Sequence, residues 1–370
     1  MIKVGLLNAY STHNIGDEAI YASFARNLAG AHLVCDLHGL GEVSVEGLSD
    51  GTPGADCDAF LSVGGDIFNN ARPWAVTRRF LANLRDLARR PAARTFMFGQ
   101  SIPPSCRGFA FAALARTLGR LSSVCVRDAR SHERLRAAGI DTRLGFDAAF
   151  GLSPSLQGER AADALLGEAG IDAARSAFIS LRGTSRLYGG GSWDLAAKLG
   201  RLAGKLDARG HRPVLLLQSR VDGADDDAAL VRELSLRLPG AKVLDLTREA
   251  GAPRWDCAAA ALARARIVVG VRYHTCVLRL LSGRSAFSLF YSNKGEDLVR
   301  RLGLPGSSID DFDPDTMLGE IERTAERDFA IAPVRASVIE DLSGALGRAL
   351  GPPRLPRLQS QPRPEILHAS

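Results

Sequence analysis

The sequence predicts two α/β domains, each built on a doubly wound parallel sheet, with a cleft between them. The chain has 370 residues, which suggests two domains at roughly 150 residues per domain. Hydrophobic residues make up 46% of the chain and charged residues 24%, as in an ordinary globular protein. Short runs that are apolar on both faces, such as VGLL and FLSV, alternate with helical patterns. Such runs are typical of strands buried in a parallel sheet.

The first series of strands and helices occupies residues 1–150, the predicted N-terminal domain. Its expected strands lie at residues 3–8, 32–37, 59–63, 95–98, 123–126 and 142–145. The expected helices between them lie at residues 17–28, 76–89, 109–118 and 129–138. Gly139 is expected to follow the last helix, because glycine readily adopts the left-handed conformation that often ends a helix.

A second series follows a predicted linker, residues 151–175, which contains a short helix. It forms the predicted C-terminal domain, residues 176–350, with strands at residues 178–181, 214–217, 242–246, 267–271 and 286–290. The helices are expected at residues 192–208, 227–238, 256–265 and 275–281. The remaining residues, 351–370, are rich in proline and arginine and are expected to be a loosely ordered tail.

The charge and the cysteines narrow the classes of function. The net charge is +6, and the excess is spread along the chain with no block of five or six like charges. This favours an anionic small ligand or an anionic surface over nucleic acid as the partner. The chain contains no run of 18 apolar residues, so we expect no transmembrane helix. The six cysteines form no CxxC pair, so we expect buried free thiols and a cytoplasmic protein.

Ligands of open α/β sheets bind beyond the carboxyl ends of the strands. In the predicted C-terminal domain, Arg272, Tyr273 and His274 follow a central strand and begin a helix. The free N–H groups and dipole of a helix start favour an anion. Arginine adds a planar donor fork suited to phosphate or carboxylate, and histidine can transfer a proton near neutral pH. The structural alternative is an arginine paired with a neighbouring acid and a histidine that caps a loop.

Two further cations follow strands of the same domain. Arg182 leaves the strand at residues 178–181 and precedes a glycine-rich loop, so we expect it to bind an anion. Lys294 follows the strand at residues 286–290 and precedes a helix, the same placement as Arg272. The structural alternatives are an ordinary flexible loop for Arg182 and a solvated lysine at a helix start for Lys294.

Polar residues also follow the strands of the N-terminal domain. Asn14 and Asp17 lie between the first strand and the first helix, and Gly65 and Asp66 follow another strand. Glycine permits close approach of the backbone to a ligand, and either aspartate can orient or deprotonate an acceptor hydroxyl. An acid at a helix start also stabilises the helix, which is the structural alternative for Asp17. Arg127 follows the strand at residues 123–126 and is a weaker candidate.

Eight segments occur in a fixed order between residues 14 and 304. They are NIGDEAI, SVGGDIF, GQSIPP, VRDARSHERLRAAGI, DAAF at residues 147–150, SLRG, VVGVRYHTCVLRLLSG and YSNKGEDLVRRLGL. This ordered set resembles the polysaccharide pyruvyltransferases. The resemblance implies a glycosyltransferase-B-like fold of two Rossmann-like domains, with the donor site largely in the C-terminal domain.

The resemblance also implies roles for individual residues. The family's arginine–x–histidine element falls on Arg272 and His274, and its strand-end arginine falls on Arg182. The chain departs from the family where Tyr273 replaces a frequent leucine, where SVGGDIF has two glycines in place of three, and at the prolines 103–104. These departures bear on the choice of acceptor.

Members of this family are enzymes that move pyruvate from phosphoenolpyruvate to sugar hydroxyls, usually as a cyclic ketal. The implied catalytic residues are His274 as the acid and Asp66 or Asp17 on the acceptor side. The implied co-substrate is phosphoenolpyruvate with no further cofactor and no metal, and the acceptor is a glycan, free or lipid-linked. The inner face of the membrane is an alternative location for such an enzyme. Two alternatives stay open, a nucleotide-sugar glycosyltransferase of the same fold and an inert carbohydrate-binding relative.

Overall fold

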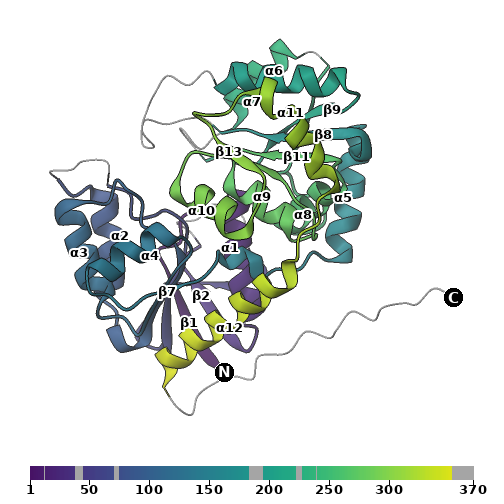
Figure 1. The fold of residues 1–370 in the computed structure, drawn as a ribbon. Helices are drawn as coiled ribbons and strands as arrows, with labels where there is room; N and C mark the ends of the chain where they lie inside the picture. The colour runs from purple at the N-terminus through teal and green to yellow at the C-terminus, as the bar shows by residue number, and fades with distance from the viewer. Residues whose placement is uncertain are drawn as a thin grey trace.

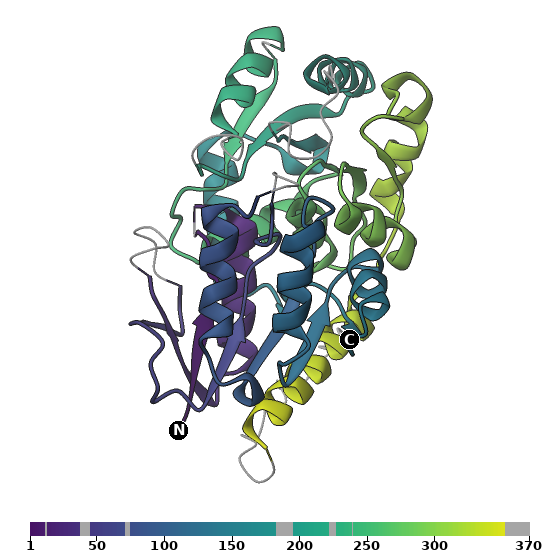
Figure 2. The same cartoon turned by 90° about the vertical axis from the view of Figure 1, so that its left-hand side faces the viewer.

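The computed structural model contains two α/β domains that pack against each other (Figures 1 and 2). It describes residues 1–11, 13–37, 45–70, 75–182, 195–221, 227–238 and 240–351. Each domain is built on one parallel sheet whose strand order reverses at its centre. The predicted fold class of two doubly wound, Rossmann-like domains is therefore confirmed.

The first domain contains a seven-stranded sheet with the order β3-β2-β1-β4-β5-β6-β7. Its strands are β1 (Ile2–Leu7), β2 (Ala31–Cys35), β3 (Leu48–Asp50), β4 (Ala59–Ser62), β5 (Thr95–Gln100), β6 (Ser123–Val126) and β7 (Arg143–Leu144). Its helices are α1 (Ile15–Asn27), α2 (Arg78–Ala88), α3 (Gly108–Leu118) and α4 (Ala129–Ala137), with the short turns η1 (Ala92–Arg94) and η2 (Ala148–Gly151). Of these seven strands, only β3 lacks a counterpart in the predicted strands, because its three residues, LSD, carry no apolar pattern.

The second domain contains a six-stranded sheet with the order β10-β9-β8-β11-β12-β13. Its strands are β8 (Ser176–Ser180), β9 (Arg212–Leu217), β10 (Lys242–Asp245), β11 (Ile267–Gly270), β12 (Phe287–Phe290) and β13 (Gly306–Ser308). Its helices are α5 (Leu156–Glu168), α6 (Leu195–Ala208), α7 (Ala228–Arg237), α8 (Arg254–Arg264), α9 (Tyr273–Leu280), α10 (Asn293–Leu302) and α11 (Pro314–Arg323), with the turns η3 (Ala173–Arg175) and η5 (Thr324–Glu326). The strand order reverses between β8 and β11, so the loops after these two strands diverge and leave room for a ligand.

Helix α1 is the main contact between the domains. Every residue from position 15 to 24 is buried, because α1 contacts η2 of its own domain as well as α8 and α9 of the other. One cluster of buried apolar side chains consequently runs through both domains, from Val4 and Phe24 to Leu262 and Leu278. The two sheets are therefore held together by a shared core.

Two segments lie differently from the predicted domain boundaries. Helix α5, in the predicted linker at residues 151–175, packs against α8 and is part of the second domain. Helix α12 (Ile331–Leu350), predicted within the second domain, returns to pack on the first sheet (Figures 1 and 2). Its buried residues Val334, Val338 and Leu342 repeat every four positions and form one apolar stripe. Of the predicted tail at residues 351–370, only Gly351 lies within the described residues.

Three further sequence expectations can be compared with the structure. Gly139 follows α4 with φ at 76°, as expected for a glycine beyond a helix end. All six cysteines are buried and free, and burial raises the pKa of the Cys106 thiol to about 12. No helix in the described part of the chain combines the length and the apolar character needed to cross a membrane.

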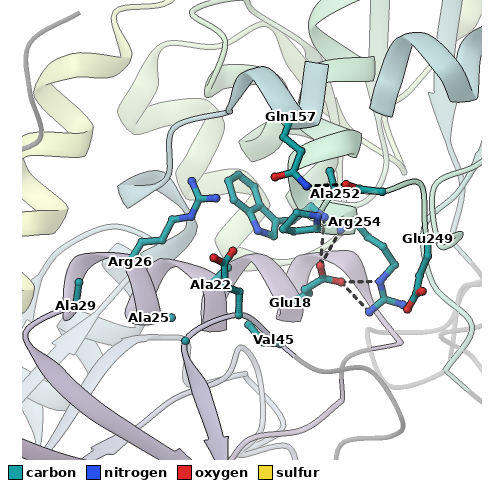
Figure 3. A pocket seen from close by; sticks show the side chains of 15 residues that line it. Glu18, Ala22, Ala25, Arg26, Ala29, Val45, Gln157, Glu249, Ala252 and Arg254 are labelled. Atoms are coloured by element: carbon teal, nitrogen blue, oxygen red, sulfur yellow. Dashed lines mark hydrogen bonds and ion pairs between the residues drawn. The ribbon is translucent and has the colours of Figure 1, made fainter. Parts of the chain in front are cut away.

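A buried ion pair also joins the domains, at one wall of a cavity of about 690 Å³ (Figure 3). Glu18 of α1 accepts hydrogen bonds from Nε of Arg254 at 2.7 Å and from its backbone N–H at 3.0 Å. Arg254 begins α8, so the Glu18 carboxylate also compensates the unpaired N–H groups of that helix end. Burial raises the pKa of Glu18, against the lowering effect of Arg254.

We expect Arg254→Leu to destabilise the protein by about 3–5 kcal/mol at about pH 8, because it leaves a buried carboxylate without its counter-charge. The deficit should shrink at about pH 5.5, since the pKa of the isolated Glu18 is raised further and the carboxyl takes up a proton in the folded state. Urea unfolding at both pH values measures this. The control is Arg264→Leu on the same helix, whose partner Asp163 is 63% exposed, with an expected loss under about 1 kcal/mol. Equal losses in both variants, or a loss independent of pH, would contradict the argument.

Candidate active site

Six polar side chains meet where the strand ends of the two domains face each other. We call this group the interdomain cluster, and it consists of Asp66, Arg127 and Asp147 from the first domain and Tyr273, His274 and Lys294 from the second. The three residues of the first domain follow β4, β6 and β7, and those of the second begin α9 and α10 after β11 and β12. The cluster thus lies at the edge of each sheet where α/β proteins bind ligands.

Asp66 connects the two domains through its carboxylate. Its Oδ1 lies 3.0 Å from Arg127 Nη2, and its Oδ2 accepts a hydrogen bond of 2.7 Å from Lys294 Nζ. Burial alone would raise the pKa of Asp66, but the charges of Lys294 and Arg127 hold it well below its usual range. Asp66 is therefore ionised at neutral pH, and such a carboxylate orients a hydroxyl better than it removes a proton.

Arg127 lies between two carboxylates with no exposed side-chain surface. It pairs with Asp66 and Asp147, and its Nε donates to Ser101 Oγ at 2.9 Å. A Cβ added to Gly65 would lie 3.2 Å from the Arg127 guanidinium, so glycine there keeps the path of this side chain open. Burial favours the neutral form, but Asp147 and Asp66 outweigh it and raise the pKa of Arg127.

Asp147 faces the second domain from the start of η2. Its Oδ1 accepts the backbone N–H of Ala149 at 2.9 Å, which fixes the carboxyl group at the cap of this turn. Its Oδ2 pairs with Arg127 and lies 3.4 Å from Nε2 of His274. Burial opposes ionisation of Asp147, but His274 and Arg127 keep its pKa well below the usual range.

His274 lies in the first turn of α9 and packs against α1. Its Nε2 is buried and has no hydrogen-bond partner among the described residues, since Asp147 lies at 3.4 Å without hydrogen-bond geometry. Burial lowers the pKa of His274, and Arg127 and Lys294 add to this effect while Asp147 opposes it. The imidazole of the unliganded protein is therefore neutral at pH 7.

Tyr273 places an aromatic ring between the cations of the cluster. The ring centroid lies 5.1 Å from the Arg127 guanidinium carbon and 5.6 Å from Lys294 Nζ, and the ring meets the His274 imidazole edge to face. These are cation–π distances, so the ring stabilises both charges. Burial and the Asp147 charge raise the pKa of Tyr273 well above its usual value, which keeps the hydroxyl protonated.

The two predicted anion-binding arginines lie at the ends of the neighbouring strands β8 and β11. Arg272 forms a buried ion pair with Asp227, whose Oδ1 and Oδ2 lie 3.0 Å and 2.9 Å from its Nε. Arg182 donates to the hydroxyl of Tyr291 and lies over its ring. The structural alternative of an arginine paired with an acid thus holds for Arg272, and donor binding by either arginine stays a prediction. The glycine-rich loop that follows Arg182 lies outside the described residues.

The loop between β1 and α1 connects the domains through its backbone. Asn14 caps α1 by accepting the N–H of Gly16 at 2.9 Å, and it forms an antiparallel bridge with Ser219 of the second domain. Asp17 is buried in the first turn of the same helix. The structure thus gives Asn14 a capping role and places Asp17 at the helix start, and their predicted roles toward a substrate stay predictions.

The structure brings together Gly65, Asp66, Tyr273, His274 and Lys294, which the sequence had placed on separate strand ends. Asp147 is not among the candidate residues expected from the sequence, and Arg127 is a weaker candidate there. The available signal was their position: Arg127 leaves β6, and Asp147 begins the DAAF segment just after β7. Which charges pair across two domains depends on how the domains dock, and no spacing within the sequence reports that.

The fold places the chain among proteins with two Rossmann-like domains of the glycosyltransferase-B type. It is similar to a putative UDP-N-acetylglucosamine 2-epimerase from Listeria monocytogenes, with a TM-score of 0.59, 10% identity and coverage of 96% of this chain and 98% of that one. It is also similar to the UDP-GlcNAc 2-epimerase of Methanocaldococcus jannaschii, with a TM-score of 0.55, 8% identity and coverage of 92% and 98%. A third similar structure is Anabaena HepE in complex with UDP and glucose, with a TM-score of 0.53, 14% identity and coverage of 93% and 100%. At these identities the similarity concerns the fold alone.

The particular family follows from the sequence itself. The chain belongs to the polysaccharide pyruvyl transferase family, whose model matches residues 14–293. The match begins at the loop before α1 and ends at the start of α10, so it includes nearly the whole interdomain cluster. None of the curated proteins compared with the chain matches it. The protein is accordingly a transferase by family.

Gly16 of α1 is the point at which His274 touches the first domain. A Cβ added there would lie 2.0 Å from His274 Nδ1, far inside van der Waals contact. We expect Gly16→Ala to displace the imidazole and to destabilise the protein by about 1–3 kcal/mol, as overpacking does. Thermal unfolding measures the stability, and the imidazole NMR signals report the displacement.

The matched control is Gly204→Ala in α6, where an added Cβ meets nothing within 4 Å. Alanine has the higher helix propensity, so this variant should be stabilised by about 0.5–1 kcal/mol. Opposite signs for the two variants are the expected result. A stabilised Gly16→Ala protein with unchanged imidazole signals would show that His274 is not held against α1.

Proposed function

We propose that this protein transfers pyruvate from phosphoenolpyruvate to two neighbouring hydroxyls of a sugar acceptor, forms a cyclic ketal and releases phosphate. The observation that carries the proposal is the unpartnered Nε2 of His274, buried beside the cations of the interdomain cluster. A side chain that protonates a carbon atom must lie within reach of the bound donor. The family membership supports pyruvyl transfer as the reaction.

The donor carries a phosphate and a carboxylate, so it requires at least two cationic groups. Lys294, Arg182 and Arg272 follow three adjacent strands of the second domain and supply them. In the described structure Asp66 pairs with Lys294 and Asp227 pairs with Arg272. Donor binding therefore has to compete with these two carboxylates or share the cations with them. The proposal requires no cofactor besides phosphoenolpyruvate.

The reaction begins when His274 gives a proton to the methylene carbon of the donor, which leaves positive charge on C2. One sugar hydroxyl adds at C2, and its proton returns to His274. The C2–O bond to phosphate then breaks, with the electron pair leaving on the phosphate. The second hydroxyl adds at C2 and closes the ring, and its proton leaves with the phosphate. Atoms and charges balance without an external oxidant or reductant.

The neutral His274 of the unliganded protein obtains its proton when the donor binds. Lys294 and Arg127 help to keep the imidazole neutral, so a bound anion that offsets these charges raises its pKa. The acid is thus formed only beside a bound donor. This order avoids the cost of a buried imidazolium in the empty site.

We assign the acceptor to the side of the first domain. Asp66 remains ionised and can hold an acceptor hydroxyl in place by accepting its hydrogen bond, with Asp17 as the second candidate. Gly65 precedes Asp66 on its loop, Asn14 caps the helix in whose first turn Asp17 lies, and Tyr273 offers a ring to a sugar face. The acceptor is a glycan, either free or carried on a lipid, and such a reaction belongs in the cytoplasm or at the inner face of the membrane.

The decisive test combines turnover with donor binding. Wild-type protein incubated with phosphoenolpyruvate and a panel of glycans should release phosphate and increase the acceptor mass by one pyruvate ketal. His274→Gln should lower turnover about 10²- to 10⁴-fold, because glutamine donates a hydrogen bond but no proton at neutral pH. Donor affinity, measured by calorimetry, should change far less.

The matched variant is Lys294→Gln, which should weaken donor binding by about 10- to 100-fold through loss of a charge-assisted hydrogen bond. If His274→Gln keeps turnover within a few-fold, the proton comes from another group. If UDP-sugars stabilise the wild-type protein and phosphoenolpyruvate does not, the chain is a glycosyltransferase and the proposal falls.

Proton uptake provides an independent test. At about pH 7.5, donor binding to wild-type protein should take up nearly one proton, because His274 passes from neutral to charged. Calorimetry in buffers of different ionisation enthalpy counts the protons. His274→Gln should take up about one proton fewer. The same count in both proteins would show that His274 does not change its charge on donor binding.

A further inference from the structure

Helices α2 and α3 form an outer face of the first domain, away from α1 (Figures 1 and 2). The two helices contact each other and cover the same side of the sheet. We call their solvent side the α2–α3 face. Its exposed charged and aromatic residues are Arg78, Arg79, Arg85, Arg89, Arg107, Phe109, Arg116 and Arg120.

The basic charge of the protein is concentrated here. Residues 75–121 contain nine arginines and one acidic residue, so this segment has a net charge of +8 while the whole chain has +6. The rest of the chain is therefore slightly acidic. The single acid, Asp86, is only partly exposed and pairs with Arg90. The expectation that the excess of basic residues is spread along the chain is therefore wrong, because residues 75–121 carry all of it.

Several arginines elsewhere on the protein surface have acidic partners. Arg136 pairs with Asp141, and on α7 and α10 an arginine pairs with a glutamate one turn earlier. On the α2–α3 face no guanidinium group pairs with a carboxylate in the described part of the chain, and Arg79 instead lies over the ring of Tyr10. Base composition explains a high arginine content, but it does not explain the absence of acids from this one face. Uncompensated like charges on one surface attract a polyanionic partner.

Phe109 shows which kind of anionic partner fits. Its side chain is 78% exposed in the first turn of α3, between Arg107 and the arginines farther along the helix. An exposed aromatic ring among cations is the pattern of a surface that lies in a membrane interface, where the ring enters the headgroup layer. An acidic protein or a nucleic acid would satisfy the arginines, but neither requires an isolated phenylalanine in open solvent.

The position of this face relates it to the interdomain cluster. Helices α2 and α3 begin at the carboxyl ends of β4 and β5, the sheet edge from which Asp66 also extends. Phe109, Arg107 and Arg78 lie at these helix starts. A membrane that contacts them would therefore pass close to the edge where the two domains meet.

We propose that the α2–α3 face binds an anionic phospholipid surface, with the arginines on lipid phosphates and Phe109 in the headgroup layer. Only one part of this rests on the proposed function, namely that the docked enzyme would meet a sugar acceptor carried on a lipid. Binding to vesicles requires neither donor nor acceptor. The docking and the reaction can therefore fail separately.

The test is co-sedimentation of the full chain with vesicles of phosphatidylcholine, with or without about 30 mol % phosphatidylglycerol. We expect binding to the anionic vesicles at about 0.1 M NaCl and its loss at about 0.5 M. Replacing two arginines together, Arg116→Gln with Arg120→Gln, should weaken binding by about tenfold or more. Phe109→Ala should weaken binding several-fold and leave the salt dependence unchanged.

The matched controls lie on α7, where Arg232 and Leu236 are also exposed. Arg232→Gln and Leu236→Ala should leave vesicle binding as in the wild type, and all variants should keep the wild-type unfolding temperature. Equal binding to neutral vesicles, or equal effects of the α3 and α7 variants, would overturn the proposal. Binding to an acidic polypeptide or to DNA without binding to vesicles would assign the face to a different partner. If vesicles bind but no pyruvate is transferred to any acceptor, the reaction falls and the docking stands.

Discussion

The charges buried where the two domains meet are paired in one network that crosses the boundary, and this pairing organises the structure. The Asp66 carboxylate is shared by Arg127 of its own domain and Lys294 of the other. Arg127 in turn holds Asp147, which faces His274. A shift of one domain against the other would leave an ionised side chain without its counter-charge. The arrangement of the domains and the ion pairs of the interdomain cluster therefore depend on each other.

This arrangement also explains why His274 can be buried with no hydrogen bond to its Nε2 atom from the described residues. Burial lowers the pKa of the imidazole, the two nearby cations add to this effect, and the Asp147 carboxylate on the other side opposes it without reversing it. The electrostatic balance is set by groups from both domains. An anion that enters the cluster alters that balance directly, without any need for a large movement of the chain.

The sequence predicted the alternation of strands and helices well, because runs such as Ile267–Gly270 are apolar throughout and their neighbours are helical. The short strands β3 and β13 have too few residues to show a pattern. Strand ends located His274, Lys294 and Asp66, since parallel sheets place them at one edge. The partner of Arg272 could not be predicted from the sequence, because Asp227 starts a helix 45 residues earlier in the chain and only the fold brings the two together. The basic charge of the α2–α3 face was not predicted for a similar reason, because the net charge of a chain does not show where its charged residues lie in the structure.

Helix α12 determines whether the first domain can be produced as a separate fragment. The chain leaves this domain near residue 151, builds the second domain and then returns, so the first domain is made from two distant pieces of sequence. Arg335 donates to the carbonyl of Leu152 and Arg348 to Ser123, which fastens the returning piece at both ends. A fragment that stops after the first seven strands would expose the apolar surface that α12 covers. The first domain therefore cannot be cut out as one continuous stretch of sequence. A fragment that folds alone would need α12 joined to the first 150 residues by a new linker.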